Sequence, residues 1–292
     1  MTEGRPDGTD SLLAEILPAV RFYEGAAGNS FLPEGTFDEE TRNAPKAYIT
    51  INTLLGDDTT EKSRFMEGKR QVSGLITPEG IGKILELYKG FYRFCVRNPA
   101  ASGLRLCAMK RCSEVEAPFI GALMSTTKMT PGEIYALGYG NKVGLALCYY
   151  TLAPGALAFD YEKMGGLYTK KQEREVLLMP GNGMKIKKLG SDSRFPGKDG
   201  LPAEVFEIEV TAPDFDIILQ DDGGCEDIVF DPGTLKIVRA VYEEINRNIG
   251  GEFPAVPDGY REWKHAFRRT VYSALRDIYH NSAESPRLRT SV

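Results

Sequence analysis

Two glutamates directly precede a short apolar run in the middle of the chain, in the stretch YTKKQEREVLLMPGNG. In an extended strand, residues two apart share one face and lie about 6.5–7 Å apart. We therefore expect the carboxylates of Glu173 and Glu175 to project in parallel into the space above the start of a strand. Their like charges repel, so the pair has a chemical role or remains in solvent. The simpler alternative is a solvated strand entrance.

Two further signals lie upstream of these glutamates. Ser125, Thr126 and Thr127 follow the apolar run GALM. A strand that changes abruptly from apolar to hydroxyl residues can mark a sheet emerging into a cleft, although such residues also form turns. Arg105 alternates with leucines and so lies on the opposite strand face from them, either as a surface residue or as a bidentate clamp for a diphosphate. Arg111 is the alternative for that role.

The overall composition favours a soluble globular protein and argues against several functional classes. The 292 residues carry a net charge of −5 and ordinary apolar content, typical of a soluble globular protein without a broad nucleic-acid surface. We expect no membrane span and no cleaved secretory signal. Five cysteines without a C-x-x-C pair predict reduced thiols and no zinc site. Both histidines, His265 and His280, lie near the C-terminus, so enzymatic chemistry would rest on carboxylates, arginines and hydroxyls.

The order of elements predicts an α+β fold. Apolar spacing and capping residues predict helices over 78–97 and 130–138, and two more from about 231 to 250 and 259 to 280. The centre contains about seven short strands with few helices between them, which excludes a doubly wound sheet. The predicted strands are GLRLCAMK, PFIGALMSTT, KVGLALCYYTL, GALAFDYEKM, EREVLLMP, GMKIKKLG and EVFEIEVTA. We divide the chain into a mixed region 1–76, a β-rich core 77–212 and a helical extension 213–292.

The arginine, the Ser-Thr-Thr run and the Glu-x-Glu strand occur in an order that resembles a known class. This class is the mono-ADP-ribosyltransferases of the arginine–serine–glutamate type, which include bacterial toxins and effectors. ALMSTT resembles the S-T-S strand of the family, EREVLLMPGNGMKIKKL its E-x-E-V-L-x-P-G strand pair, and EVFEIEV its closing strand. The resemblance covers about residues 80–212. It implies two packed, mainly antiparallel sheets with an N-terminal helical layer and C-terminal helices.

The resemblance also implies a mechanism with NAD as co-substrate and no metal. Glu175 would hydrogen-bond the ribose 2′-hydroxyl and stabilise the oxocarbenium-like charge that develops as nicotinamide leaves. Glu173 would orient or deprotonate the acceptor. Ser125 would hold Glu175 and the nicotinamide ribose, and Arg105 would bind the diphosphate.

Further contacts follow from the same resemblance. Thr126 and Thr127 would complete the NAD-binding strand, and Phe159 or Tyr161 would stack on nicotinamide. Tyr168 would contact the acceptor protein. Each of the three aromatic residues has the alternative role of a core side chain. A glutamate two residues before the catalytic one favours arginine as the acceptor, with threonine or serine hydroxyls as the alternative.

The resemblance implies a bacterial protein that acts on a host protein in the host cytosol, and relatives modify actin, small GTPases and ubiquitin. Three other functions stay open. One is an NAD glycohydrolase with water as the acceptor. Another is a retaining glycosidase, whose carboxylates lie about 5–5.5 Å apart, although its usual barrel would alternate strands with helices. The last is a non-enzymatic interaction module.

Overall fold

The structure is a computed structural model. It describes residues 15–20, 22–23, 47–56, 61–62, 65, 68–115, 117–163, 173–219, 226–249 and 251–283. The chain divides into two compact units, which we describe separately. The sheet unit is Cys95–Phe215, and the helical unit combines Met1–Phe94 with Asp216–Val292. This division groups residues 77–94 with the helices, whereas the sequence analysis grouped them with the core.

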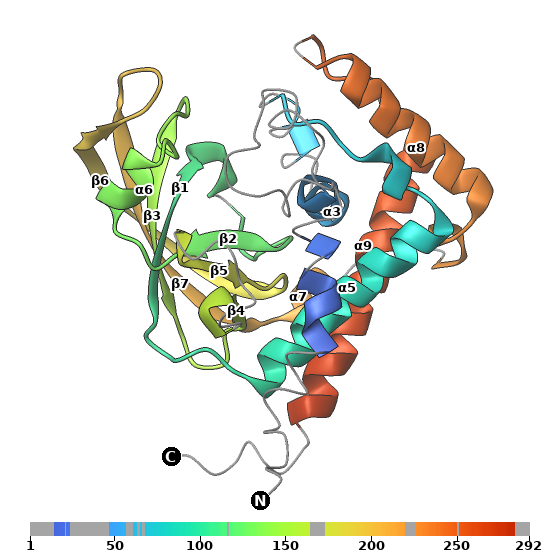
Figure 1. Cartoon of the computed structure of the whole chain (residues 1–292), viewed down its shortest axis with the longest axis horizontal. Coiled ribbons are helices and arrows are strands. Elements are labelled where there is room, and N and C mark those ends of the chain that lie inside the picture. The colour runs from blue at the N-terminus through green and yellow to red at the C-terminus, as the bar shows by residue number, and fades with distance from the viewer. Residues whose placement is uncertain are drawn as a thin grey trace, which may run out of the picture. The chain divides into compact units, whose positions relative to one another are not determined.

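The sheet unit contains one seven-stranded sheet with the order β4-β5-β2-β1-β3-β7-β6 (Figure 1). Its strands are β1 (Arg105–Arg111), β2 (Met124–Thr127), β3 (Leu145–Leu152), β4 (Ala158–Asp160), β5 (Glu175–Leu178), β6 (Asn182–Pro196) and β7 (Pro202–Pro213). Every neighbouring pair is antiparallel except β3 and β7. The α+β class and the mainly antiparallel pairing are therefore confirmed. The expectation of two packed sheets is wrong for the described strands, which form one continuous sheet.

One predicted strand is much shorter than its apolar sequence suggests. Only MSTT of the segment PFIGALMSTT forms β2. The residues before it bond to the turn between β5 and β6 instead: the amide of Ile120 donates to the carbonyl of Asn182, and the amide of Gly181 donates to the carbonyl of Ile120. The backbone groups of this segment are satisfied outside the main ladder, so the strand starts late.

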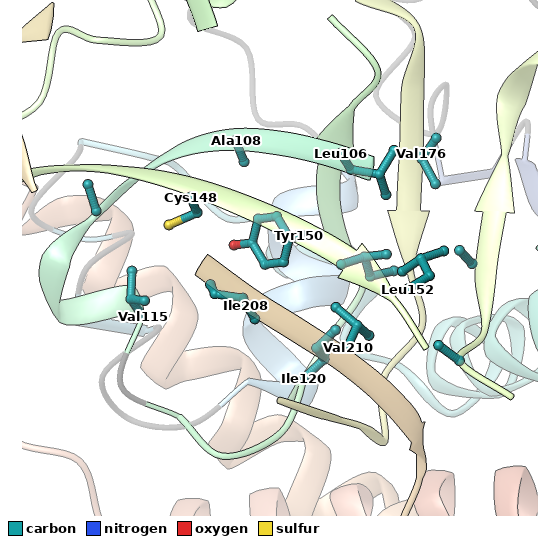
Figure 2. Close-up of a cluster of buried hydrophobic side chains, with 14 residues drawn as sticks. Leu106, Ala108, Val115, Ile120, Cys148, Tyr150, Leu152, Val176, Ile208 and Val210 are labelled. Atoms are coloured by element: carbon teal, nitrogen blue, oxygen red, sulfur yellow. The ribbon is translucent and has the colours of Figure 1, made fainter. Parts of the chain in front are cut away.

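The two faces of the sheet pack differently. One face, which we call the core face, carries the larger apolar cluster and is closed by Val115 and Ile120 from the β1–β2 connection. Figure 2 shows Tyr150 and Leu152 of β3 near Ile208 and Val210 of β7, their paired neighbours. Residues 207–210 of β7 alternate between exposed and buried at a period of two, as a strand with one covered face does.

The opposite face is covered in part by α6 (Pro131–Ala136), and we call it the α6 face. Ile134 of α6 packs with Cys107, Met109 and Leu147 in a second, smaller cluster. Thr130 caps α6, and its hydroxyl and the Glu133 carboxylate form the predicted capping box. The rest of this face is exposed only in part, at Arg105, Ser125 and Tyr149, and it carries the candidate site.

The tight turn between β5 and β6 is hydrogen-bonded to the loop that precedes β4. The Asn182 side chain is fully buried and bonds both backbone groups of Leu157: Nδ2 donates to the carbonyl at 2.7 Å, and Oδ1 accepts from the amide at 3.0 Å. Gly181 has a positive φ of 94°, which favours glycine. The side-chain amide of Asn182 thus connects β6 to the loop before β4.

The helical unit is built from helices at both ends of the chain. They include α3 (Ala47–Leu55), η1 (Ser73–Leu75), α5 (Pro78–Arg97), α7 (Phe215–Ile218), η5 (Glu226–Val229), α8 (Pro232–Arg247) and α9 (Asp258–Ala283), of which α5 and α7 reach into the sheet unit at one end. Asp231 caps α8 by accepting from the amide of Thr234 at 2.7 Å. The predicted helices are confirmed. Among the residues that the structure describes, no helix is long and apolar enough to span a membrane.

A buried polar cluster lies inside the helical unit. Lys264 Nζ lies 3.0 Å from Glu61 Oε2, and both side chains are 4% exposed. The hydroxyl of Tyr260 donates to the other oxygen of Glu61 and lies 3.2 Å from the hydroxyl of Tyr242. Burial raises the pKa of both tyrosines well above the ordinary value. Every member of this cluster is buried, and the hydrogen bonds within it help to offset the cost of taking the two charges out of water.

Candidate functional site

Ser125 and Glu175 meet on the α6 face although fifty residues separate them in the chain. β2 and β5 are antiparallel neighbours, with Thr127 opposite Glu175 and Ser125 opposite Leu177. This register places Ser125 diagonally across from Glu175 on the same face. The serine hydroxyl donates to Glu175 Oε1 at 2.5 Å, the short distance of a charge-assisted hydrogen bond. Glu175 is 8% exposed and Ser125 is exposed, so a largely buried carboxylate is bonded to a hydroxyl that solvent reaches.

The other two hydroxyls of the Ser-Thr-Thr run bond to the backbone. Thr126 lies on the core face and donates to the carbonyl of Val176 at 2.7 Å. Thr127 donates to the carbonyl of Glu173 at 2.5 Å and accepts from the amide of Met129 at 3.0 Å. Both threonines are buried. The structure thus brings Ser125, but neither threonine hydroxyl, to the Glu175 carboxylate.

Glu173 is not in the strand that holds Glu175. β5 begins at Glu175, and Arg174 has a positive φ of 45°. Among the described residues, no other non-glycine residue has a positive φ. The expectation that the two glutamates share one strand face is therefore wrong, because a left-handed residue between them breaks the alternation of side chains. Glu173 lies before this turn, with its carbonyl bonded to Thr127.

A group of ion pairs surrounds the same turn. Lys128 Nζ lies 2.6 Å from both Asp160 Oδ2 and Glu162 Oε2, and Arg174 Nε lies 3.3 Å from Glu162 Oε1. Burial lowers the pKa of Lys128, but the hydrogen bonds that Lys128 donates to Asp160 and Glu162 outweigh this effect and leave its pKa raised. The hydrogen bond from Lys128 lowers the pKa of Glu162. The sequence analysis missed this network, because its partners lie on three separate segments.

Both candidate arginines lie on the same face as Glu175. Cys107 pairs with Thr127, which pairs with Glu175, so the alternate residues Arg105 and Arg111 of β1 share this face. Strand spacing places the Cα of Arg105 about 12 Å from that of Glu175, and that of Arg111 about 17 Å away. Arg105 is exposed, whereas Arg111 is partly buried. The geometry therefore places the more accessible arginine nearer to the carboxylate.

The predicted aromatic ligands are buried. Phe159 and Tyr161 are fully buried, and their rings pack edge to face with centroids 5.0 Å apart. Neither offers a ring face to a ligand in this structure, as expected for core side chains. Tyr168 lies outside the described residues. Tyr149, which the sequence analysis did not single out, pairs with Cys107 and is 36% exposed on the α6 face. The alternation of β3 is the signal that would have found it.

Comparison with known proteins adds no relative: no family model matches the chain, and no significant match is found among curated proteins. Within the described ranges, no three histidine, cysteine, aspartate or glutamate side chains gather as a metal site would require. The site consists of a buried carboxylate, an exposed serine and an exposed arginine on one face of a mainly antiparallel sheet.

Proposed function

We propose that this protein is an NAD-dependent mono-ADP-ribosyltransferase that modifies a protein side chain and releases nicotinamide. The observation that carries the proposal is the 2.5 Å hydrogen bond between Ser125 and Glu175. These residues belong to two motifs whose resemblance to the arginine–serine–glutamate class rests on sequence. Their meeting on adjacent strands of a mainly antiparallel sheet supports the chemistry of that class.

The carboxylate of Glu175 is suited to stabilise positive charge. When the bond between ribose and nicotinamide breaks, charge develops at the ribose carbon, and a fixed anion nearby lowers the barrier. One such preorganised group typically contributes about 2.7–4 kcal/mol. Glu175 is largely buried, which strengthens its field, and Ser125 fixes its orientation. Ser125 is exposed and therefore able to contact the ribose as well.

The α6 face also offers groups for the rest of NAD. Arg105 is exposed at the start of β1, where its planar guanidinium can bind a diphosphate in a bidentate manner. We propose Arg105 rather than Arg111 for this role, because Arg111 is partly buried. Tyr149 provides an exposed aromatic ring on the same face, which Phe159 and Tyr161 do not. The residues of this face thus fit NAD as co-substrate.

Glu173 is proposed to accept a proton from the acceptor, which we take to be an arginine of a host protein, with threonine or serine as the alternative. The family resemblance suggests actin, a small GTPase or ubiquitin as candidate targets, and a bacterial protein that reaches the host cytosol. An NAD glycohydrolase is the second candidate function. One observation favours it: the turn at Arg174 removes Glu173 from the strand face of Glu175, so cleavage and acceptor activation depend on separately positioned groups.

Incubation of the full chain with labelled NAD and a host-cell lysate tests the proposal. The wild-type protein should label a protein band, and Glu175→Gln should not. Glu243→Gln is the control, because Glu243 is an exposed partner of Arg239 in α8. Equal labelling by the wild-type and Glu175→Gln proteins would contradict the assignment. NAD loss without a labelled protein would indicate the glycohydrolase, and no NAD binding by calorimetry would indicate an interaction module.

A further inference from the structure

The turn between the two glutamates is held from several directions. A left-handed conformation at a non-glycine residue such as Arg174 costs on the order of 1–3 kcal/mol, so surrounding contacts must maintain it. The Thr127 hydroxyl bonds the carbonyl of Glu173 at 2.5 Å, and the Lys128 amide bonds the carbonyl of Arg174 at 3.2 Å. Thr127, the last residue of β2, and Lys128, which follows it, therefore bond the carbonyls of Glu173 and Arg174 and fix the backbone of the turn.

Side-chain charges hold the same turn. Lys128 is 15% exposed and Asp160 13%, so this ion pair is well shielded from solvent. Glu162 bonds both Lys128 and Arg174, and so links the turn to the end of β4. Removal of Lys128 would leave two carboxylates, one of them largely buried, without their shared cation. Such a loss is costly for partly buried groups, and it would weaken the side-chain support of the turn, although the bonds from the Thr127 hydroxyl and the Lys128 backbone amide remain.

Glu175 is held by different contacts. It is the first residue of β5, where all four strand residues pair with β2, and its carboxylate is bonded by Ser125. A change at Lys128 would therefore displace Glu173 relative to Glu175 and leave the Ser125–Glu175 pair in place. The position of Glu173 can therefore change without a change in the position of Glu175.

We propose that the Arg174 turn, held by Thr127 and Lys128, is a positioning device that sets the place of Glu173 and thereby decides how the ADP-ribosyl group is divided between a protein acceptor and water. This inference rests on the proposed function and deepens it. Lys128 and Arg174 are positioning residues, because they act through Glu173 and not on NAD.

The chemistry explains why the division depends on Glu173. In both reactions the bond between the ribose carbon and the nicotinamide nitrogen breaks, and its electron pair leaves with nicotinamide. In transfer, an acceptor nitrogen or oxygen forms the new bond to that carbon and gives its proton to Glu173. In hydrolysis, water forms the bond and releases its proton to the solvent. Displacement of Glu173 therefore slows transfer more than cleavage.

Lys128→Met tests this division. We expect the amount of labelled protein per NAD consumed to fall about tenfold, which corresponds to ~1.4 kcal/mol, while NAD consumption changes less than about twofold. Lys188→Met is the matched control, because it breaks an ion pair with Glu204 on the core face; its ratio should equal that of the wild type. A parallel fall of labelling and consumption in Lys128→Met would overturn the proposal, since general destabilisation lowers both.

A pair of substitutions at Arg174 tests the backbone conformation itself. Glycine adopts a positive φ freely, whereas a β-branched residue opposes it. Arg174→Gly should keep a ratio of labelling to consumption near that of the wild type, and Arg174→Val should lower it. Equal ratios in the two variants would overturn the role of the turn, because both lack the side-chain contact to Glu162.

If the wild-type protein consumes no NAD, the proposed function fails, and the positioning role is then decided by crystal structures. A Lys128→Met structure in which Arg174 leaves the left-handed region while β5 and the Ser125–Glu175 bond persist would support the device. An unchanged turn would overturn it.

Discussion

Two carboxylates are buried to a similar degree in the two units of this protein, and their surroundings differ. Glu61 in the helical unit is 4% exposed, and Glu175 in the sheet unit is 8% exposed. Glu61 bonds the ammonium of Lys264 and the hydroxyl of Tyr260, which are themselves 4% and 1% exposed. Glu175 bonds Ser125, which is exposed.

The difference separates a structural carboxylate from a candidate catalytic one. In the helical unit the charge is compensated by a cation, and solvent is excluded from every bonded partner, so the group can contribute only to stability and specificity. In the sheet unit Ser125, one bonded partner of Glu175, reaches the surface, so a ligand can approach the pair. Burial alone therefore does not indicate a functional carboxylate; the accessibility of its partner does.

The largest effect on stability is expected from Lys264→Met. The substitution leaves Glu61 buried without its cation, which should destabilise the helical unit by about 3–5 kcal/mol. Trp263, the single tryptophan of the chain, is fully buried in α9 and reports unfolding of this unit by its fluorescence. Lys236→Met, at an exposed position of α8, is the control. Unchanged stability in Lys264→Met would contradict the structural role of the Glu61–Lys264 ion pair.

Glu175→Gln should lower activity and leave stability nearly unchanged, the reverse of the effect expected for Lys264→Met. We expect NAD turnover to fall about 10²–10³-fold, because the neutral amide cannot stabilise the developing charge, while the melting temperature changes little. The measurement is the rate of nicotinamide release beside a thermal scan. Glu61→Gln should not lower turnover per folded molecule. If both substitutions lowered stability alone, Glu175 would be a structural carboxylate like Glu61.

Asn182→Ala removes a fully buried polar side chain in the same unit as Glu175. Loss of the Asn182 side-chain amide leaves the buried backbone N–H of Leu157 without this partner, at about 1–3 kcal/mol, whereas the Leu157 carbonyl keeps the hydrogen bond from the Met179 amide. We expect the unfolding free energy measured by denaturant titration of the full chain to fall by about 1–3 kcal/mol. Turnover per folded molecule should stay near the wild-type value. A loss of turnover without a loss of stability would show that a polar side chain with only buried hydrogen-bond partners can still act in catalysis.

Alkaline pH should weaken the sheet unit by a smaller amount. Burial raises the pKa of Cys107 to about 11 and that of Cys148 to about 12. The folded state keeps these protons above about pH 8.5, where an unfolded thiol loses them, so stability is full below that pH and declines as pH rises toward 11–12. Cys148→Ala should reduce this decline by about 1–2 kcal/mol between pH 8 and 10 in unfolding titrations. An identical slope in the variant would contradict the raised pKa of Cys148.

Local sequence patterns predicted most elements. The apolar spacing and the caps Thr130 and Asp231 predicted helices that the structure confirms, and short apolar segments predicted seven strands that it also contains. The short length of β2 was not predictable, because its upstream residues bond to a turn sixty residues later in the chain. The burial of Phe159 and Tyr161 was not predictable either, since an aromatic residue is equally suited to a core and to a ligand.

The sequence alone determined the types of element, their order and the presence of hydroxyl and carboxylate residues at two strand ends, because periodicity and capping act within a few residues. The tertiary structure decided that Ser125 contacts Glu175, that Arg174 turns Glu173 out of the strand, and that Glu61 lies beside Lys264, 203 residues away. These contacts depend on strand order and helix packing, in which the burial of whole faces outweighs the preferences of single residues.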